Sequence, residues 1–152
     1  MNVNFKPAAP ADLESLVGFM HALYAHDQIA FDEQVARQGL AQLVADESLG
    51  RVWLIAVDEV AAGYIVLTYG FSLEYHGRDA FIDEFFVGAE WRGRGVGLRA
   101  LEFVADFCRT EGIAAVHLAV AHANARALHV YRRFGFEAHE RYIMTKWLHR
   151  EE

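Results

Sequence analysis

Apolar residues in the first half of the chain follow helical spacing twice and then form strand-like runs. Within residues 12–26 they recur at helical intervals, which predicts an amphipathic helix with Asp12 at its N-cap. A looser stripe after Asp32 predicts a second helix. Segments rich in β-branched and aromatic residues predict strands over residues 2–6, 51–57 and 60–74.

The second half changes to a strand, helix and strand rhythm. Residues 80–87 are predicted to form a strand, a glycine-rich turn follows from Trp91 to Gly97, and the next helix runs to about Thr110. The near-continuous apolar run over residues 113–121 is typical of a strand covered on both faces. The last predicted elements are a short helix and a closing strand or strand pair, over residues 124–134 and 136–147.

This order of elements predicts one α/β domain, mixed α+β in content, over residues 1–152. Three antiparallel strands followed by a β-α-β crossover give a mixed, mostly antiparallel twisted sheet with helices on both faces. The chain has 152 residues and is 54% hydrophobic, which suffices for a single core.

Charge and cysteine content narrow the function. The 21 acids against 14 bases give a formal net charge of -7, opposite to what a nucleic-acid binder needs, so no nucleic-acid partner is expected. No apolar run has the length of a membrane span and the first residues lack a secretion pattern, which predicts a cytoplasmic protein without a membrane partner. A single cysteine, Cys108, and 8 scattered histidines predict neither a disulfide framework nor a metal site.

The segment from Arg92 to Gly97 is the most informative stretch of the sequence. Glycines between a strand and a helix let main-chain N–H groups point into one concavity, so the turn predicts a phosphate or pyrophosphate site assisted by Arg92 and Arg94. A tight turn with solvated arginines is the alternative. The Gly-Lys-Ser/Thr of a nucleotide triphosphatase is missing, and a partial dinucleotide fingerprint lacks its later acid.

Two segments resemble the motifs of the GNAT acyl-CoA N-acetyltransferases. Residues 83–97, DEFFVGAEWRGRGVG, are similar to the central motif of that family, and residues 124–136, NARALHVYRRFGF, are similar to its second motif. The two blocks lie in the family's order along the chain. The acid-acid-Phe-Phe-Val strand and the Tyr-Arg-Arg run further resemble the diamine (spermidine/spermine-type) acetyltransferase branch.

The resemblance implies a GNAT-like fold and an N-acetyltransferase that moves an acetyl group from acetyl-CoA to a primary amine of a small molecule. The amine attacks directly in a ternary complex. The alternatives are a non-catalytic CoA-binding regulatory module, or acetylation of a protein or peptide amine. Family analogy also implies a homodimer.

A polyamine or diamine is the favoured acceptor. Acids near the region where family acceptors bind would attract a polycation, and they equally fit an ordinary solvated surface. These acids are Asp27, Asp32, Glu33 and Glu74.

The resemblance also assigns residues to acetyl-CoA binding. The pyrophosphate lies on the glycine turn, the pantetheine arm pairs with the preceding strand, and the later helix contacts the arm. The residues so assigned are Phe85, Phe86, Val87, Arg92, Gly93, Arg94, Gly95, Val96, Gly97, Asn124, Ala127 and Tyr131.

Tyr131, Glu84 and Asp83 are the candidates for catalysis. The resemblance implies that Tyr131 protonates the departing thiolate; alternatively, Tyr131 is a core aromatic and Asn124 only a helix N-cap. The amine must lose a proton, which a carboxylate can accept. Asp83 and Glu84 are adjacent on a strand, so their side chains are expected on opposite faces. Glu84 is preferred and Asp83 is kept, although either could be a buried acid paired with an arginine.

Overall fold

The computed structural model describes residues 1–149, and the chain divides into two compact units. The first unit is Met1–Ala119 and the second is Val120–Glu152, whose last three residues lie outside the described part. The first unit holds the sheet, three α-helices and the glycine turn. The predicted mixed, mostly antiparallel sheet with helices on both faces is confirmed there.

Five strands of the described residues form one sheet in the order β1-β2-β3-β4-β5. Neighbours are antiparallel except β4 and β5, which are parallel. Their bounds are β1 Val3–Pro7, β2 Gly50–Val57, β3 Val60–Ser72, β4 Gly77–Val87 and β5 Ala115–Leu118. A parallel neighbour needs a crossover connection, and helix α3 provides it between β4 and β5.

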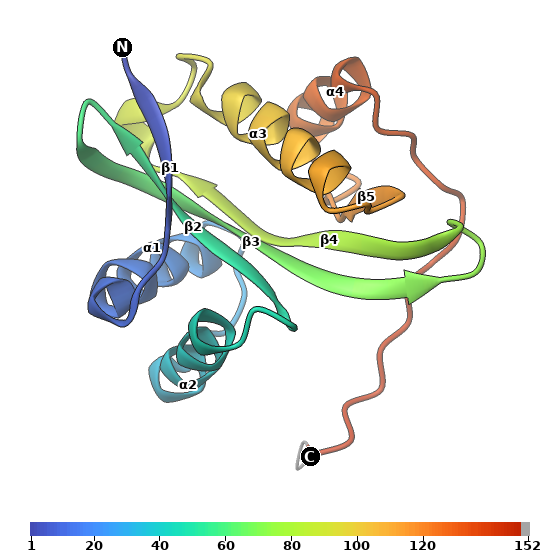
Figure 1. The fold of residues 1–152 in the computed structure, drawn as a ribbon, viewed down its shortest axis with the longest axis horizontal. Coiled ribbons are helices and arrows are strands. Elements are labelled where there is room, and N and C mark those ends of the chain that lie inside the picture. Colours follow the sequence, from blue (N-terminus) through green and yellow to red (C-terminus); the bar gives the residue numbers. More distant parts are fainter. Residues whose placement is uncertain (150–152) are drawn as a thin grey trace. The chain divides into compact units, whose positions relative to one another are not determined.

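Helices cover both faces of the sheet. Figure 1 shows α1 (Leu13–His26) and α2 (Glu33–Ala45) on one face and α3 (Val96–Thr110) on the other. On the first face Leu16 and Leu40 pack with Tyr64 and Phe86, and on the second face Val96 packs with its neighbours from β2 and β3. Alternating residues of the central strands therefore enter two different cores.

The predicted N-cap of α1 is confirmed in position but not in bonding, since Asp12 is the N-cap residue. The Asp12 carboxylate makes no cap bond to α1; it accepts from the main-chain N–H of Ala9 at 2.8 Å, which lies upstream. By contrast the Asp32 carboxylate does cap its helix, α2, accepting from the N–H of Val35 at 3.2 Å.

The second unit contains helix α4 (Ala125–Phe134), which ends at Gly135 in a left-handed conformation. The predicted closing strand over residues 136–147 is wrong, because residues 136–149 form no strand. A strand exists only when it pairs, and the described part of this unit offers no second strand. The predicted strand over residues 113–121 is likewise shorter, since pairing with β4 stops at Leu118.

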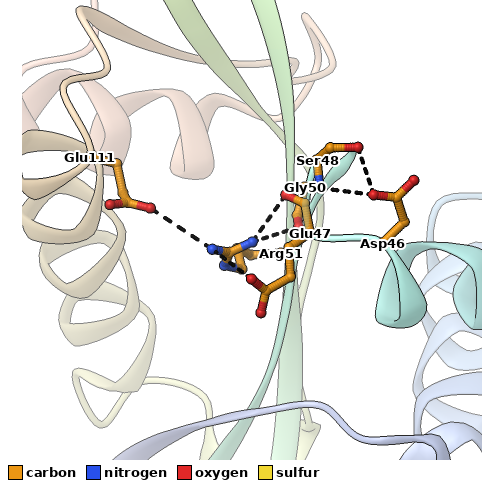
Figure 2. A network of polar contacts seen from close by, with 6 residues as sticks. All are labelled: Asp46, Glu47, Ser48, Gly50, Arg51 and Glu111. Carbon is orange, nitrogen blue, oxygen red and sulfur yellow. Dashed lines mark hydrogen bonds and ion pairs between the residues drawn. The ribbon is translucent and has the colours of Figure 1, made fainter.

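A polar network joins the end of α3 to the start of β2. Figure 2 shows Arg51 between Glu111 and the loop that precedes β2. Its guanidinium donates to the carbonyl of Glu47 at 3.0 Å and lies 3.8 Å from the Glu111 carboxylate. Arg78 donates to the main-chain carbonyl of Glu111 at 3.2 Å. Two cations thus lie at the C-terminal end of α3, where the helix dipole favours positive charge.

Within residues 1–149, no helix combines the length and the apolar character that crossing a bilayer requires.

Candidate functional site

The glycine turn lies between a single turn of 3-10 helix, Ala89–Trp91, and α3. Gly93 and Gly95 have φ of 74° and 81°, the left-handed region that side chains disfavour. A Cβ added at either position would meet nothing within 4 Å. Glycine is therefore required by the backbone conformation of the turn and not by crowding.

The two arginines of the turn lie over aromatic rings of the residues that precede it. Arg92 donates from Nε to the carbonyl of Val87 at 2.8 Å and lies 5.3 Å from the centre of the Phe86 ring. Arg94 lies 5.4 Å from the centre of the Trp91 ring. Both cations are thereby held beside the turn while their outer N–H groups remain available to an anion.

The first turn of α3 presents main-chain donors without a competing acid. No side chain caps Gly95, and the first turn of the helix carries no acidic residue. The opening N–H groups of a helix lack partners within it, and they carry partial positive charge. Together with Arg92 and Arg94, they form a site that fits a phosphate or pyrophosphate.

The strand that leads into this turn loses one of its neighbours. β4 pairs with β5 only from Asp79 to Ile82, so the rest of β4 has no strand on that edge in the described residues. Gly88 donates to Ala62 at 2.7 Å on the β3 side, and ladder bonds alternate along an antiparallel pair. Phe85 and Val87 consequently turn their main-chain groups toward the unpaired edge. The carbonyl of Val87 already accepts from Arg92 there, and the other groups can bind an extended ligand.

The first of the two acids of β4, Asp83, forms a β-bulge. Ile82 is opposite Leu67 and Glu84 is opposite Val66, so Asp83 is an extra residue without a partner on β3. The strict alternation of Asp83 and Glu84 predicted from the sequence is therefore interrupted. The register sets Glu84 on the face of α1 and α2, since its partner Val66 belongs to the core on that face.

Glu84 is held by two tyrosine hydroxyls. Tyr24 Oη, from α1, donates to Glu84 Oε2 at 2.5 Å, and Tyr64 Oη, from β3, donates to Oε1 at 2.7 Å. Tyr64 is fully buried, whereas Tyr24 and Glu84 are half-buried. Each carboxylate oxygen thus has its own neutral donor, which fixes the orientation of the carboxyl plane.

The environment of Glu84 favours proton uptake. Burial raises the pKa of Glu84 above its usual range, the two tyrosine hydrogen bonds act against this rise, and the negative charge of Asp83 adds to it. Burial also raises the pKa of Tyr64 and of Tyr24, with Glu84 adding to both increases, so the two hydroxyls keep their protons and remain donors. Partial desolvation raises the pKa of Asp83, although its side chain is more exposed than that of Glu84.

The candidates of the second unit lie on or beside α4. Asn124 is the N-cap of α4, and its Oδ1 accepts from the N–H of Ala127 at 3.1 Å. Tyr131 is half-buried, and its ring meets that of Phe136 edge-on at 5.9 Å. Asn124, Ala127 and Tyr131 follow the spacing of one helix face. Their roles toward acetyl-CoA stay predictions, as do those of the glycine turn.

Several acids predicted near the acceptor have local partners instead. Asp32 caps α2, and Glu33 lies 4.0 Å from Arg37. Asp27 lies 3.2 Å from His26. Their positions give the polyamine prediction no further support.

Cys108 is buried in α3, and burial raises the pKa of its thiol to about 11. The thiol is therefore protonated near neutral pH, which makes it a poor nucleophile. Among the described residues, no group of three or more His, Cys, Asp or Glu side chains gathers as metal ligands would.

Sequence reasoning missed the two tyrosines that hold Glu84. Tyr24 lies in the helix predicted over residues 12–26, and Tyr64 lies in the strand predicted over residues 60–74. The signal was available in their chemistry, because a buried tyrosine needs a partner for its hydroxyl. The sequence does not show which residue that partner is, because Tyr24 and Tyr64 lie 60 and 20 positions before Glu84.

The sequence is similar to those of known acetyltransferases. The family model of the acetyltransferase (GNAT) family matches residues 17–136. An L-methionine sulfoximine/L-methionine sulfone acetyltransferase from Pseudomonas aeruginosa is 28% identical, over 90% of this chain and 81% of its own length. Thialysine N-epsilon-acetyltransferase from Bos taurus is 30% identical, but the match covers only 48% of this chain and 42% of the bovine protein.

Solved structures share the fold over nearly the whole chain. An integron cassette protein from the mobile metagenome of Cole Harbour Salt Marsh has a TM-score of 0.84 and 35% identity, covering 97% of this chain and 91% of the other. An aminoglycoside N-acetyltransferase, AAC(6')-Iy, in complex with CoA has a TM-score of 0.80 at 17% identity, covering 97% and 95%. The chain belongs to the GNAT acetyltransferase family, and by that membership it is an acyltransferase.

Proposed function

We propose that the protein transfers an acetyl group from acetyl-CoA to a primary amine of a small molecule. One observation carries this proposal: in a chain of the GNAT family, Glu84 is oriented by two neutral donors beside the unpaired edge of β4. A carboxylate of raised proton affinity at that place suits the deprotonation of an amine.

The residues of the first unit fit the parts of acetyl-CoA. The glycine turn and the start of α3 supply donors for the pyrophosphate, with Arg92 and Arg94 beside them. The outward main-chain groups of Phe85 suit the amides of a pantetheine arm, whereas the carbonyl of Val87 is already bound by Arg92. The likeness to a CoA-bound acetyltransferase supports the same choice. Bound acetyl-CoA would supply an acetyl thioester, an electrophilic carbonyl with a thiolate as leaving group.

Glu84 acts on the proton of the amine. An alkyl amine with a pKa of about 10.4 is almost fully protonated at about pH 7, and removing the proton costs about 4.6 kcal/mol. The ionised Glu84 accepts this proton, directly or through a water, as the amine nitrogen forms its bond to the acetyl carbon. Asp83 remains the second candidate, because its charge acts on Glu84 and both tyrosines.

Two further groups complete the proposed reaction. The N–H of Val87 faces the unpaired edge and suits the carbonyl oxygen as negative charge develops on it. Tyr131 is proposed to donate a proton to the sulfur as the carbon–sulfur bond breaks, so that CoA leaves as a thiol. Replacing Tyr131 by Phe should lower kcat with little change in acetyl-CoA affinity; an unchanged kcat would remove Tyr131 from this role.

The acceptor is proposed at the level of its class. The methionine sulfoximine/sulfone acetyltransferase and the aminoglycoside acetyltransferase described above are named for small molecules, which supports a small-molecule amine. Polyamines and diamines remain one hypothesis within that class. Acetylation of a protein or peptide amine is the alternative, and a homodimer in the cytoplasm stays a prediction.

The test is CoA-thiol release with acetyl-CoA and a panel of amines: polyamines, amino acids and their analogues, aminoglycosides and a lysine peptide. We expect turnover with at least one small amine and less with the peptide. Isothermal calorimetry checks the donor, with Gly95→Ala expected to weaken acetyl-CoA binding and Gly18→Ala as the control. Acetyl-CoA binding without thiol release from any amine would favour the non-catalytic module.

A further inference from the structure

Glu84 is gripped from two elements at once, and the grip is asymmetric. Tyr64 comes from the middle of β3 and is fully buried with Leu16 and Phe86 in the core beneath α1. Tyr24 comes from α1, is only half-buried, and meets the edge of Phe31 at 5.7 Å. One hydroxyl is therefore fixed by the sheet, while the other depends on how α1 packs on it.

No cation among the described residues acts on Glu84. Across the described residues, no ion pair joins Glu84 to a lysine, arginine or histidine. The titratable groups that influence it are Tyr24 from α1, Tyr64 from β3 and Asp83 from β4. A cationic partner would typically lower the pKa of a carboxyl by about 1–3 units and make it a weaker base. Hydroxyl donors orient the carboxylate at a smaller loss of basicity.

We propose that Tyr24 and Tyr64 are positioning residues that aim the Glu84 carboxylate at the amine and tune its readiness to accept a proton. This inference rests on the proposed function of Glu84 as the base. The hydroxyls do not exchange protons with the substrate. They act through Glu84, by holding one oxygen each so that the remaining lone pairs face the reaction.

The proposal predicts a change in the pH profile and not only in rate. Removing a hydroxyl that bonds to the ionised carboxylate destabilises that form, so the pKa of Glu84 rises further. In Tyr64→Phe and in Tyr24→Phe, the acid limb of kcat/KM should move to higher pH. We expect kcat/KM to fall severalfold on that limb, with a smaller loss on the plateau where Glu84 is ionised.

Tyr69 offers a matched control on the same strand as Tyr64. Within residues 1–149 its buried hydroxyl has no hydrogen-bond partner, so Tyr69→Phe removes an oxygen without breaking a described bond. This variant should keep the acid limb of the unaltered protein. Because Tyr64 is fully buried and its variant could fold poorly, Tyr24→Phe provides the second measurement. An equal fall in kcat/KM at every pH in both variants would mean a structural role and overturn the proposal.

A direct titration separates this inference from the proposed activity. Carbon-13 NMR of labelled glutamate carboxyls, with the Glu84 signal assigned by its loss in Glu84→Gln, reports the pKa of Glu84 without any substrate. We expect a higher value in Tyr24→Phe and an unchanged value in Tyr69→Phe. No change in Tyr24→Phe would overturn the tuning role even if the enzyme is active. Absence of turnover in the unaltered protein would instead contradict the proposed function.

Discussion

Two glutamates of the first unit show how differently one side chain can be used. Glu111 lies just after α3 with its side chain 37% exposed and faces Arg51, while Arg78 binds its carbonyl (Figure 2). Glu84 lies half-buried in β4 and has two neutral hydroxyl partners. The first carboxylate is matched by charge and accessible to solvent. The second is partly desolvated and has no counter-charge within residues 1–149.

The difference indicates which acid is available for chemistry. The Glu111 carboxylate is engaged in a structural ion pair with Arg51. Glu84, held by hydroxyls in a partly desolvated place, has a raised pKa, and its burial costs folding stability. The contacts of Arg51 therefore connect the end of α3 to the start of β2. The environment of Glu84 instead fits its proposed role as the base.

The largest effect is expected from Glu84→Gln. The amide keeps the size of the side chain but cannot accept the amine proton, so kcat/KM should fall by about 10²–10⁴ in an amine-acetylation assay near neutral pH. The loss should shrink above the pKa of the amine, where the nucleophile is already neutral. Asp83→Asn should cause a smaller loss. A larger loss in Asp83→Asn would reverse the assignment.

A smaller effect, on stability alone, is expected from Arg51→Ala. The variant loses hydrogen bonds to two main-chain carbonyls and the contact with the Phe107 ring. Urea unfolding should show a free energy of unfolding lower by about 1–2 kcal/mol, with kcat/KM unchanged. Glu111→Gln, at the exposed end of the same network, should cost about 0.5 kcal/mol or less. A change in kcat/KM for Arg51→Ala would show that the two regions are coupled.

The smallest effect concerns the pH dependence of stability. Because the folded pKa of Glu84 is raised, the unfolded chain ionises first as the pH increases. The free energy of unfolding should therefore fall between the ordinary glutamate pKa and the raised folded value. Glu84→Gln lacks this decrease, so its stability relative to the unaltered protein should improve with pH across that window. Parallel curves from urea unfolding at several pH values would contradict the raised pKa.

The sequence predicted the layers of the first unit because apolar periodicity records which face of each element is buried. The glycine turn was also predictable, since Gly93 and Gly95 need positive φ. Glu84 was named from a family resemblance, but alternation along the strand does not record the bulge at Asp83. The strand predicted over residues 136–147 failed because a strand needs a partner, and apolar composition does not identify one.

The extra residue in β4 has a consequence for how the acids of this protein can vary. If Asp83 were paired in a regular strand without the β-bulge, every later side chain of β4 would lie on the opposite face of the sheet. Glu84 would then face the core around Val96. The number of residues in the bulge therefore decides which acid lies next to Tyr24 and Tyr64. Replacing Asp83 by alanine would keep the number of residues in the bulge. Inserting one more residue there would exchange the two faces of the strand that follows it.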